Sequence, residues 1–140
     1  MDVFSKEKRS SIMACVSSKN TAPEKIVRSL LHRMGFRFRI HRRDLPGSPD
    51  IVLPRYRIVI FVHGCFWHQH EGCSASKRPN SNSEYWTKKL DGNVQRDLKN
   101  MQLLHNLGWM PIVIWECELR DMDKLENRLS TLFTNNSPVE

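Results

Sequence analysis

The sequence has 140 residues, the size of one domain, and it is 39% hydrophobic, enough to bury a core without disulfide bonds. No apolar run approaches the roughly 20 residues that span a bilayer, and the N-terminus lacks the apolar stretch of a secretory signal. We therefore expect a cytoplasmic protein, neither secreted nor membrane-embedded, whose cysteines bind a metal or are simply buried.

The net charge of +7 is concentrated near the N-terminus. Residues 1–48 hold eleven Lys and Arg against four Asp and Glu, whereas residues 49–140 hold eleven of each. This asymmetry favours a polyanionic partner, and nucleic acid is favoured over a membrane because no strongly apolar helical face accompanies the charge. The alternative is an ordinary solvated basic surface.

The first predicted elements are a basic arm and a helix. Residues 1–20 mix basic and apolar side chains, which indicates an arm or a short helix that orders on binding. Thr21 is then placed to cap a helix, and Glu24, three residues later, completes a capping box. Apolar residues repeat at helical spacing until Gly35, which is placed to end the helix in the left-handed conformation.

Three strands are predicted next. Residues 36–41 alternate apolar and basic side chains, the period of a strand with one buried face. After the turn-rich segment DLPGSP, residues 51–53 and 57–62 predict a hairpin, and the second of these strands is apolar enough to be central and buried on both faces. Residues 74–83 are polar and predict a loop.

A long helix is predicted from Glu84 to Leu107, ended by Gly108. Its expected inward positions are Leu90, Val94, Leu98, Met101 and Leu104. Residues 111–115 predict another buried strand, and residues 121–133 predict a last helix. The expected inward positions of that helix are Leu125, Leu129 and Leu132.

The predicted order α-β-β-β-α-β-α indicates an α/β or mixed three-layer domain, because helices alternate with an apolar sheet. We expect a basic arm at residues 1–20, one folded domain at residues 21–134 and a polar tail at residues 135–140. No oligomerisation signal is visible, so we expect a monomer.

The segment HGCFWHQHEGC at residues 63–73 predicts a metal site, because cysteine thiolates and histidine nitrogens are the ligands that zinc favours. Cys65, Cys73 and the distant Cys117 would complete a Cys3His site with one histidine. Spacing alone leaves His63, His68 and His70 as equal candidates for that histidine. The alternative is a set of buried thiols without metal, and Cys15 in the arm is interpreted as a bystander.

Asp50 and His63 predict a catalytic site, because they begin one strand and end the next, so the hairpin brings them to one end of the sheet. A carboxylate that binds Mg²⁺ beside histidines that move protons suits hydrolysis of a phosphodiester. Taken singly, an aspartate at a turn is more often a cap. Phe66 and Trp67 lie among polar ligands; they either stack on or wedge between bases, or pack over the metal loop.

Five segments together resemble the very short patch repair endonucleases, in order and at compatible spacing from about Lys6 to about Leu132. They are TAPEK at 21–25, SPD at 48–50, FVHGCFWHQHEGC at 61–73, EYWTKKLDGNVQRD at 84–97 and LGWMPIVIWECEL at 107–119. The resemblance implies the restriction-endonuclease fold with a central mixed sheet. It also implies a bacterial enzyme that nicks one DNA strand beside a T:G mismatch left by deamination of 5-methylcytosine.

The resemblance also implies roles for individual residues. Asp50 matches the magnesium-binding aspartate and His68 the histidine that acts as general base or its helper. His63 matches a second histidine near the cleaved phosphate, and Glu24 a helix glutamate near the metal waters. The residues that match the ligands of a structural zinc ion are Cys65, His70, Cys73 and Cys117.

Further matches concern DNA binding. Phe66, Trp67 and Trp86 match aromatic residues that push into the duplex beside the mismatch, and Met13 lies in an arm that grips the DNA from the opposite groove. Val62 stands where a threonine occurs in the family; the metal contact is retained if the backbone carbonyl makes it and lost if a hydroxyl does.

The sequence departs from the wider nuclease pattern at two places. No acidic-x-Lys follows Pro49-Asp50 on the next strand, where Phe61-Val62-His63 stand instead, and a histidine in place of the lysine fits this family. The ligand loop has one extra residue before Cys73.

The sequence therefore predicts a Mg²⁺-dependent, zinc-stabilised enzyme that nicks double-stranded DNA at T:G mismatches and works alongside a 5-methylcytosine methyltransferase. Two alternatives remain. One is a zinc-stabilised DNA-binding module without hydrolytic activity, and the other is a restriction-type nuclease that needs no mismatch.

Overall fold

The structure is a computed structural model that describes residues 21–136 and 138. The predicted arm at residues 1–20, with Met13 and Cys15, lies outside the described residues, as do residues 137, 139 and 140 of the predicted tail. The elements are α2 (Ala22–Arg33), β1 (Arg39–Ile40), β2 (Ile51–Leu53), β3 (Ile58–His63), the 3-10 turn η1 (Ser74–Ser76), α3 (Ser83–Asn106), β4 (Met110–Trp115), the 3-10 turn η2 (Glu116–Arg120) and α4 (Met122–Asn135).

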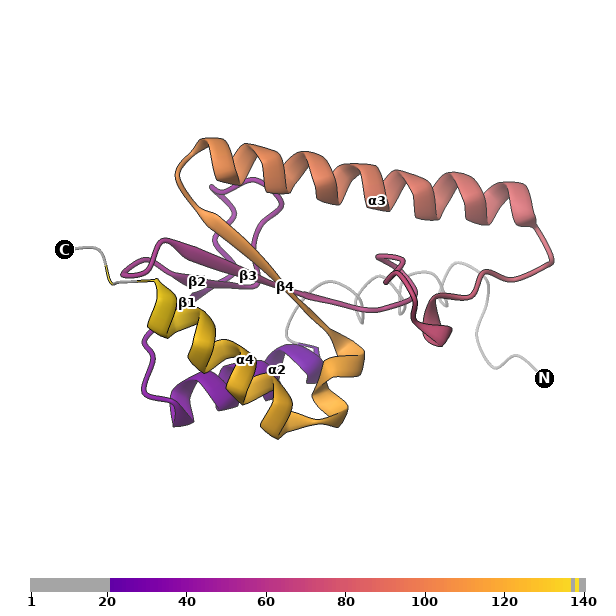
Figure 1. Ribbon diagram of the computed structural model, residues 1–140. Helices are drawn as coiled ribbons and strands as arrows, with labels where there is room; N and C mark the ends of the chain where they lie inside the picture. The colour runs from indigo at the N-terminus through magenta and orange to yellow at the C-terminus, as the bar shows by residue number, and fades with distance from the viewer. Residues whose placement is uncertain (1–20, 137, 139–140) are drawn as a thin grey trace, which may run out of the picture.

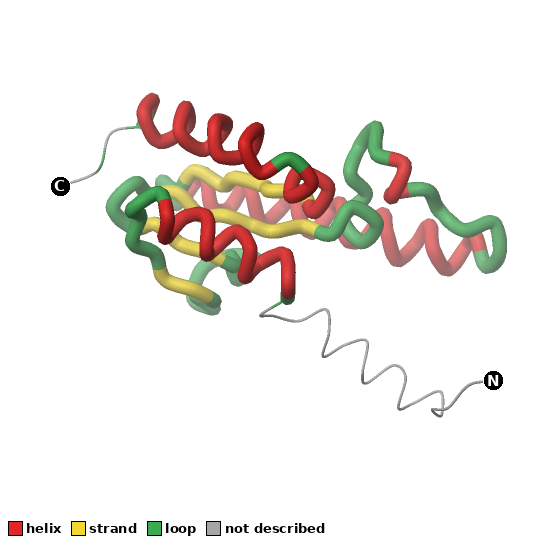
Figure 2. The backbone as a smooth tube through the Cα atoms, turned by 90° about the horizontal axis from the view of Figure 1, so that it is seen from below, coloured by secondary structure: helices red, strands yellow, loops and turns green. Residues whose placement is uncertain are grey.

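The elements form three layers around a mixed sheet of order β1-β2-β3-β4. The first three strands pair antiparallel, and β4 pairs parallel to β3. Helices α2 and α4 cover one face and α3 crosses the other, as both ribbon views show (Figures 1 and 2). The predicted α/β class, three-layer arrangement and order of helices and strands are confirmed.

The β2–β3 hairpin is the centre of the sheet. Its register pairs Ile51 with Ile60 and Leu53 with Ile58, and all four side chains are buried against α2 and α4. Val52 and Val59 alternate with them and belong to the second cluster of buried side chains, beneath α3. A one-residue slip would exchange the two faces, so the apolar pattern fixes which residues meet at the open end of the hairpin.

Helix α2 begins and ends as its sequence predicts. The Thr21 hydroxyl accepts a hydrogen bond from the Glu24 N–H at 3.4 Å, and Gly35 adopts a φ of 89° just after the helix. Val27, Leu30 and Leu31 are fully buried against the sheet. Glu24 lies on this buried side, so the first turn of α2 carries a carboxylate into the interior.

Helix α3 packs on the sheet over only part of its length. Its 24 residues extend about 36 Å, whereas a six-residue strand extends about 20 Å, so the helix projects beyond the sheet over the loop after β3 (Figure 1). The inward side chains include Leu90 and Leu104, both fully buried. Leu98 was expected to face inward, but it is 57% exposed, so that expectation is wrong.

Two strands differ from their predicted burial because they lie at the edges of the sheet. The strand expected at residues 36–41 is reduced to the two residues of β1, and Ile40 is exposed. Strand β4 pairs with β3 alone, and of its residues only Ile114 is fully enclosed. In α4 the buried position falls on Phe133, whereas Leu132 is only half-buried.

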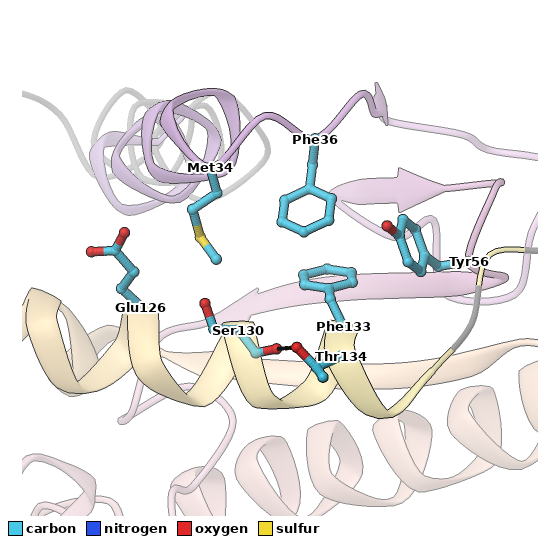
Figure 3. A pocket seen from close by; sticks show the side chains of 7 residues that line it. All are labelled: Met34, Phe36, Tyr56, Glu126, Ser130, Phe133 and Thr134. Carbon is cyan, nitrogen blue, oxygen red and sulfur yellow. Dashed lines mark hydrogen bonds between the residues drawn. The ribbon is translucent and has the colours of Figure 1, made fainter.

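An open hollow of about 400 Å³ lies between the ends of α2 and α4 (Figure 3). Three aromatic rings, Phe36, Tyr56 and Phe133, contact one another there, with centroids 4.1–5.6 Å apart. Tyr56 belongs to the turn of the hairpin, so this hollow is at the opposite end of the sheet from Asp50.

Among the described residues, no helix is long and apolar enough to cross a membrane.

Because only some side chains of α3 are buried, replacing leucine by alanine should lower the free energy of unfolding by different amounts at two positions. Leu104→Ala should lower the free energy of unfolding by about 2–5 kcal/mol, because it opens a cavity in the core. Leu98→Ala, the matched control on the same helix, should change it by less than about 0.5 kcal/mol. Urea denaturation measures both, and equal losses would contradict the packing described for α3.

Candidate active site and metal centre

Asp50 is held at the open end of the hairpin by the backbone of the neighbouring strand. The Val62 N–H donates to Asp50 Oδ2 at 2.7 Å, and the His41 N–H donates to the Asp50 carbonyl at 3.3 Å. Burial raises the pKa of Asp50 to about 6, helped by the neighbouring Glu24, while the Val62 N–H opposes the rise. Near pH 6 a proton and a metal ion therefore compete for this carboxylate.

Glu24 and His41 lie beside Asp50, and Arg28 contacts Glu24. Arg28 Nη2 donates to Glu24 Oε2 at 2.9 Å, and His41 Nε2 lies 3.1 Å from the same oxygen. One ligand atom each from Glu24, His41 and Asp50 lies within 4.8 Å of the other two, close enough to hold one metal ion. The carboxylates of Glu24 and Asp50 offer the hard oxygen ligands that Mg²⁺ prefers.

His63, His68 and Asp97 form a second group beside the first. The two imidazole rings stack with centroids 3.7 Å apart and planes 5° apart. Asp97 Oδ2 lies 2.6 Å from His68 Nδ1, so the carboxylate orients this ring. Burial, aided by His68, lowers the pKa of His63 to about 4, so His63 is neutral at pH 7. Its Nδ1 is buried without a hydrogen-bond partner among the described residues.

The side chains predicted at the hairpin end are thus divided between two groups. Asp50 precedes β2 and His63 ends β3, so both lie at the open end of the hairpin, as expected. The side chain of Asp50, however, lies with those of Glu24 and His41, whereas His63 lies with His68 and Asp97. Val62 joins the two groups, because its N–H binds Asp50 and the next residue in the strand is His63.

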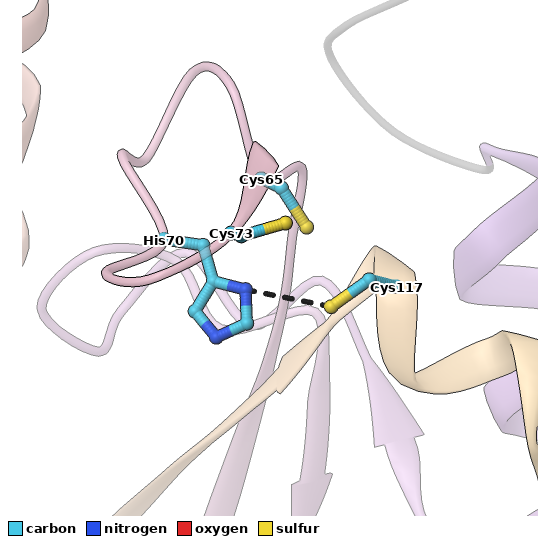
Figure 4. A group of neighbouring side chains, drawn as sticks. All are labelled: Cys65, His70, Cys73 and Cys117. Atoms are coloured by element: carbon cyan, nitrogen blue, oxygen red, sulfur yellow. Dashed lines mark hydrogen bonds between the residues drawn. The ribbon is translucent and has the colours of Figure 1, made fainter. Parts of the chain in front are cut away.

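Cys65, His70, Cys73 and Cys117 form the third group (Figure 4). One ligand atom from each lies within 4.8 Å of the others, and His70 Nδ1 is 3.4 Å from the Cys117 sulfur. The three loop residues are brought together by tight turns, with the His70 N–H bound to the Cys65 carbonyl at 2.9 Å, and Cys117 comes from η2. Sulfur and imidazole ligands in this number suit a tetrahedral metal site.

Of the three histidines that spacing left as equal candidates, the structure places His70 with the thiols. His63 and His68 lie instead with Asp97. Burial raises the pKa of the Cys65 thiol to about 11, so metal binding must displace its proton.

Three aromatic residues gather where the ligand loop meets the start of α3. Phe66, Trp67 and Trp86 have ring centroids 5.1–5.9 Å apart, and Trp67 is 38% exposed. The Asn93 amide donates to the Trp67 carbonyl at 3.0 Å, which ties the loop to α3. The predicted aromatic group is therefore partly packed and partly open to a partner.

Comparison with known proteins identifies the family. A sequence profile described as "DNA mismatch endonuclease Vsr" matches residues 1–74. The DNA mismatch endonuclease Vsr of Escherichia coli is 43% identical over 93% of this chain and 83% of its own length. The chain belongs to the Vsr family. It is therefore a DNA endonuclease, as the sequence predicted.

Two further comparisons agree. The type II nicking enzyme V.XorIIP of Xanthomonas oryzae is 52% identical over 94% of this chain and 96% of its own length. The catalytic domain of homing endonuclease I-Bth0305I has a TM-score of 0.58, covering 83% of this chain and 97% of that domain at 22% identity. The second likeness concerns the fold alone and supports the restriction-endonuclease-like architecture.

Sequence reasoning missed Arg28, His41 and Asp97 as members of these groups. Asp97 carried a detectable signal, because positions 90, 94, 97, 101 and 104 form one helical stripe and Asp97 is its only charged residue. Choosing Leu98 over Asp97 as the inward residue hid that signal. Arg28 and His41 carried none, because neither residue type nor spacing marks them.

The third group predicts one thiolate-bound metal ion per chain. Titration with Co²⁺ should give the strong visible absorption of a tetrahedral thiolate site. Cys117→Ser should weaken binding by about tenfold or more, since even the loss of contacts outside a ligand shell costs about 10–100-fold. Cys15→Ser is the control and should bind as the unaltered protein does. Equal spectra for all three proteins would contradict the assignment.

Proposed function

We propose that this Vsr-family endonuclease uses Mg²⁺ to nick one DNA strand 5′ of the thymine in a T:G mismatch left by deamination of 5-methylcytosine. The observation that carries the proposal is the pairing of two groups at one end of the hairpin: carboxylates suited to a divalent cation, and an imidazole oriented by a carboxylate. The Vsr relatives named for mismatch cleavage and for nicking support the reaction class.

Mg²⁺ would have as its protein ligands the carboxylates of Asp50 and Glu24 and the Val62 carbonyl. Bound there, Mg²⁺ would supply positive charge to a phosphate oxygen and to the developing negative charge of the reaction. Val62 serves through its backbone, so the absence of a threonine hydroxyl costs no ligand in this assignment.

His68 is the proposed general base. It takes a proton from a water molecule as the water oxygen bonds to phosphorus, and the bond from phosphorus to the 3′ oxygen breaks. The 3′ oxygen takes up a proton from solvent, which leaves a 5′-phosphate and a 3′-hydroxyl. Asp97 stabilises the imidazolium that forms on His68, and the neutral His63 is free to donate a hydrogen bond to the phosphate.

The Cys3His group is the proposed structural zinc site. Zinc at Cys65, His70, Cys73 and Cys117 would tie the irregular ligand loop to η2 and fix the direction of the aromatic residues. In this proposal the soft thiolate ligands select zinc, which has a structural role, and the hard carboxylate ligands select Mg²⁺, which has a catalytic role.

The aromatic group is the proposed source of mismatch specificity. Phe66, Trp67 and Trp86 would enter the duplex beside the mispaired bases, and the arm containing Met13 would hold the DNA from the other groove. A mismatched step unstacks at lower cost than a paired one, so an inserted wedge favours it.

The remaining parts of the proposal rest on the family. We propose a basic arm at residues 1–20, an endonuclease domain at residues 21–134 and a polar tail at residues 135–140. The enzyme would act as a monomer in the bacterial cytoplasm, alongside a 5-methylcytosine methyltransferase.

Strand cleavage of end-labelled duplexes tests the proposal. Each duplex carries a T:G pair in a different methyltransferase site, beside its T:A control, with Mg²⁺ or with EDTA. We expect one Mg²⁺-dependent nick 5′ of the mispaired thymine in one sequence context. Asp50→Asn should lose about 10²-fold or more in cleavage while DNA binding stays, and the exposed Asp44→Asn is the matched control.

Other outcomes support the alternatives. Equal cleavage of T:G and T:A duplexes would favour a restriction-type nuclease. Binding without any Mg²⁺-dependent cut would favour a DNA-binding module.

The wedge makes a separate prediction. Trp67→Ala should reduce the preference for T:G over T:A duplexes more than it reduces general DNA affinity, because stacking contributes about 1–3 kcal/mol per base. Leu107→Ala, exposed at the far end of α3, is the control. Fluorescence anisotropy and cleavage rates on both duplexes give the comparison, and equal losses of the two quantities would refute the wedge.

A further inference from the structure

Two basic side chains meet a single oxygen of a buried carboxylate. Arg28 Nη2 and His41 Nε2 lie 2.9 Å and 3.1 Å from Glu24 Oε2, and they lie 3.3 Å from each other. Glu24 is 4% exposed, so protein contacts must replace the water that a carboxylate needs. With the proton on Nε2, His41 donates to Glu24, and the two donors hold that oxygen from two directions.

The backbone conformation places both donors beside Glu24. Arg28 follows Glu24 by four residues in α2, so the side chains lie on the same face of the helix. His41 has a φ of 52°, a left-handed conformation uncommon for residues other than glycine, and its N–H binds the Asp50 carbonyl. A strained backbone at such a site points to a functional constraint on where the ring lies.

Arg28 and His41 together form a clamp on Glu24, a carboxylate that lies beside Asp50. Ligand atoms of Glu24 and Asp50 are within 4.8 Å, and the Glu24 carboxylate disfavours the charge of Asp50. The guanidinium of Arg28 offsets part of this repulsion before any cation arrives. Hydrogen bonds from outside a ligand shell orient carboxylates that bind metals, and their loss typically costs about 10–100-fold in metal affinity.

We propose that Arg28 and His41 are positioning residues that clamp Glu24 in the orientation required by the divalent cation at Asp50. The inference rests on the proposed roles of Asp50 and Glu24 in metal binding. Neither Arg28 nor His41 contacts the metal or the DNA in this proposal; they act through Glu24.

Two substitutions of His41 test the clamp. His41→Gln and His41→Leu are both uncharged, but only the glutamine amide can donate to Glu24 in place of Nε2. His41→Leu should raise the Mg²⁺ concentration for half-maximal nicking by about tenfold, whereas His41→Gln should stay within about twofold of the unaltered enzyme. DNA affinity in EDTA and the midpoint of thermal unfolding should change little in either variant.

Arg28→Lys is an independent second variant, because it keeps the charge and loses the fixed fork of the guanidinium. It should raise the half-saturating Mg²⁺ concentration in the same direction. Calorimetric titration with Mg²⁺ in the absence of DNA provides a readout separate from activity.

Three outcomes would overturn the clamp. The first is an unchanged Mg²⁺ requirement in His41→Leu and Arg28→Lys. The second is an equal rise of the Mg²⁺ requirement in His41→Gln and His41→Leu, together with the loss in both variants of a nitrogen coupling seen in the spin-echo spectrum of Mn²⁺ bound to the unaltered enzyme. That result would make His41 a metal ligand. The third is full Mg²⁺-dependent nicking by Glu24→Gln and Asp50→Asn, and this alone would refute the proposed metal site as well.

Discussion

The hydrogen bond from the Val62 N–H to the Asp50 carboxylate is the contact on which the arrangement of the candidate site depends. It forms at 2.7 Å because the register of β2 and β3, in which Ile51 is opposite Ile60, brings Asp50 next to the end of β3, where its side chain reaches the Val62 N–H. Burial between two helical layers raises the pKa of Asp50 to about 6, and the Val62 N–H limits that rise. The same strand carries His63 onward to the second group, so one strand end positions both groups of the candidate site.

Ligand chemistry separates the two proposed metal ions. Oxygen ligands gather at the end of the sheet, where the buried Glu24 contacts two basic side chains, and sulfur ligands gather in the loop beyond it. Cys65 lies two residues after His63, so the loop that binds the soft metal is a direct continuation of β3. This loop places Phe66 and Trp67 beside Trp86 of α3, which connects the proposed metal site to the aromatic group.

The sequence predicted most of the architecture because local signals agreed with the tertiary structure. The N-cap at Thr21, the hairpin and the C-terminal end of α3 follow from capping, alternation and glycine placement. Edge strands were predicted less well, because the alternation of β1 cannot show that the sheet ends there. Leu98, an apolar residue next to the true inward stripe, was expected to face inward and so concealed Asp97, and the contacts of Arg28 and His41 exist only in three dimensions.

Crystals of the protein with mismatched DNA, grown with Mn²⁺ in place of Mg²⁺, would test the central claim that two chemically distinct metal sites flank one strand end. Anomalous diffraction at the manganese and zinc absorption edges distinguishes the two metals. The account predicts manganese at Asp50 and zinc at Cys65, His70, Cys73 and Cys117. Manganese bound by His63, His68 and Asp97, with none at Asp50, would contradict it.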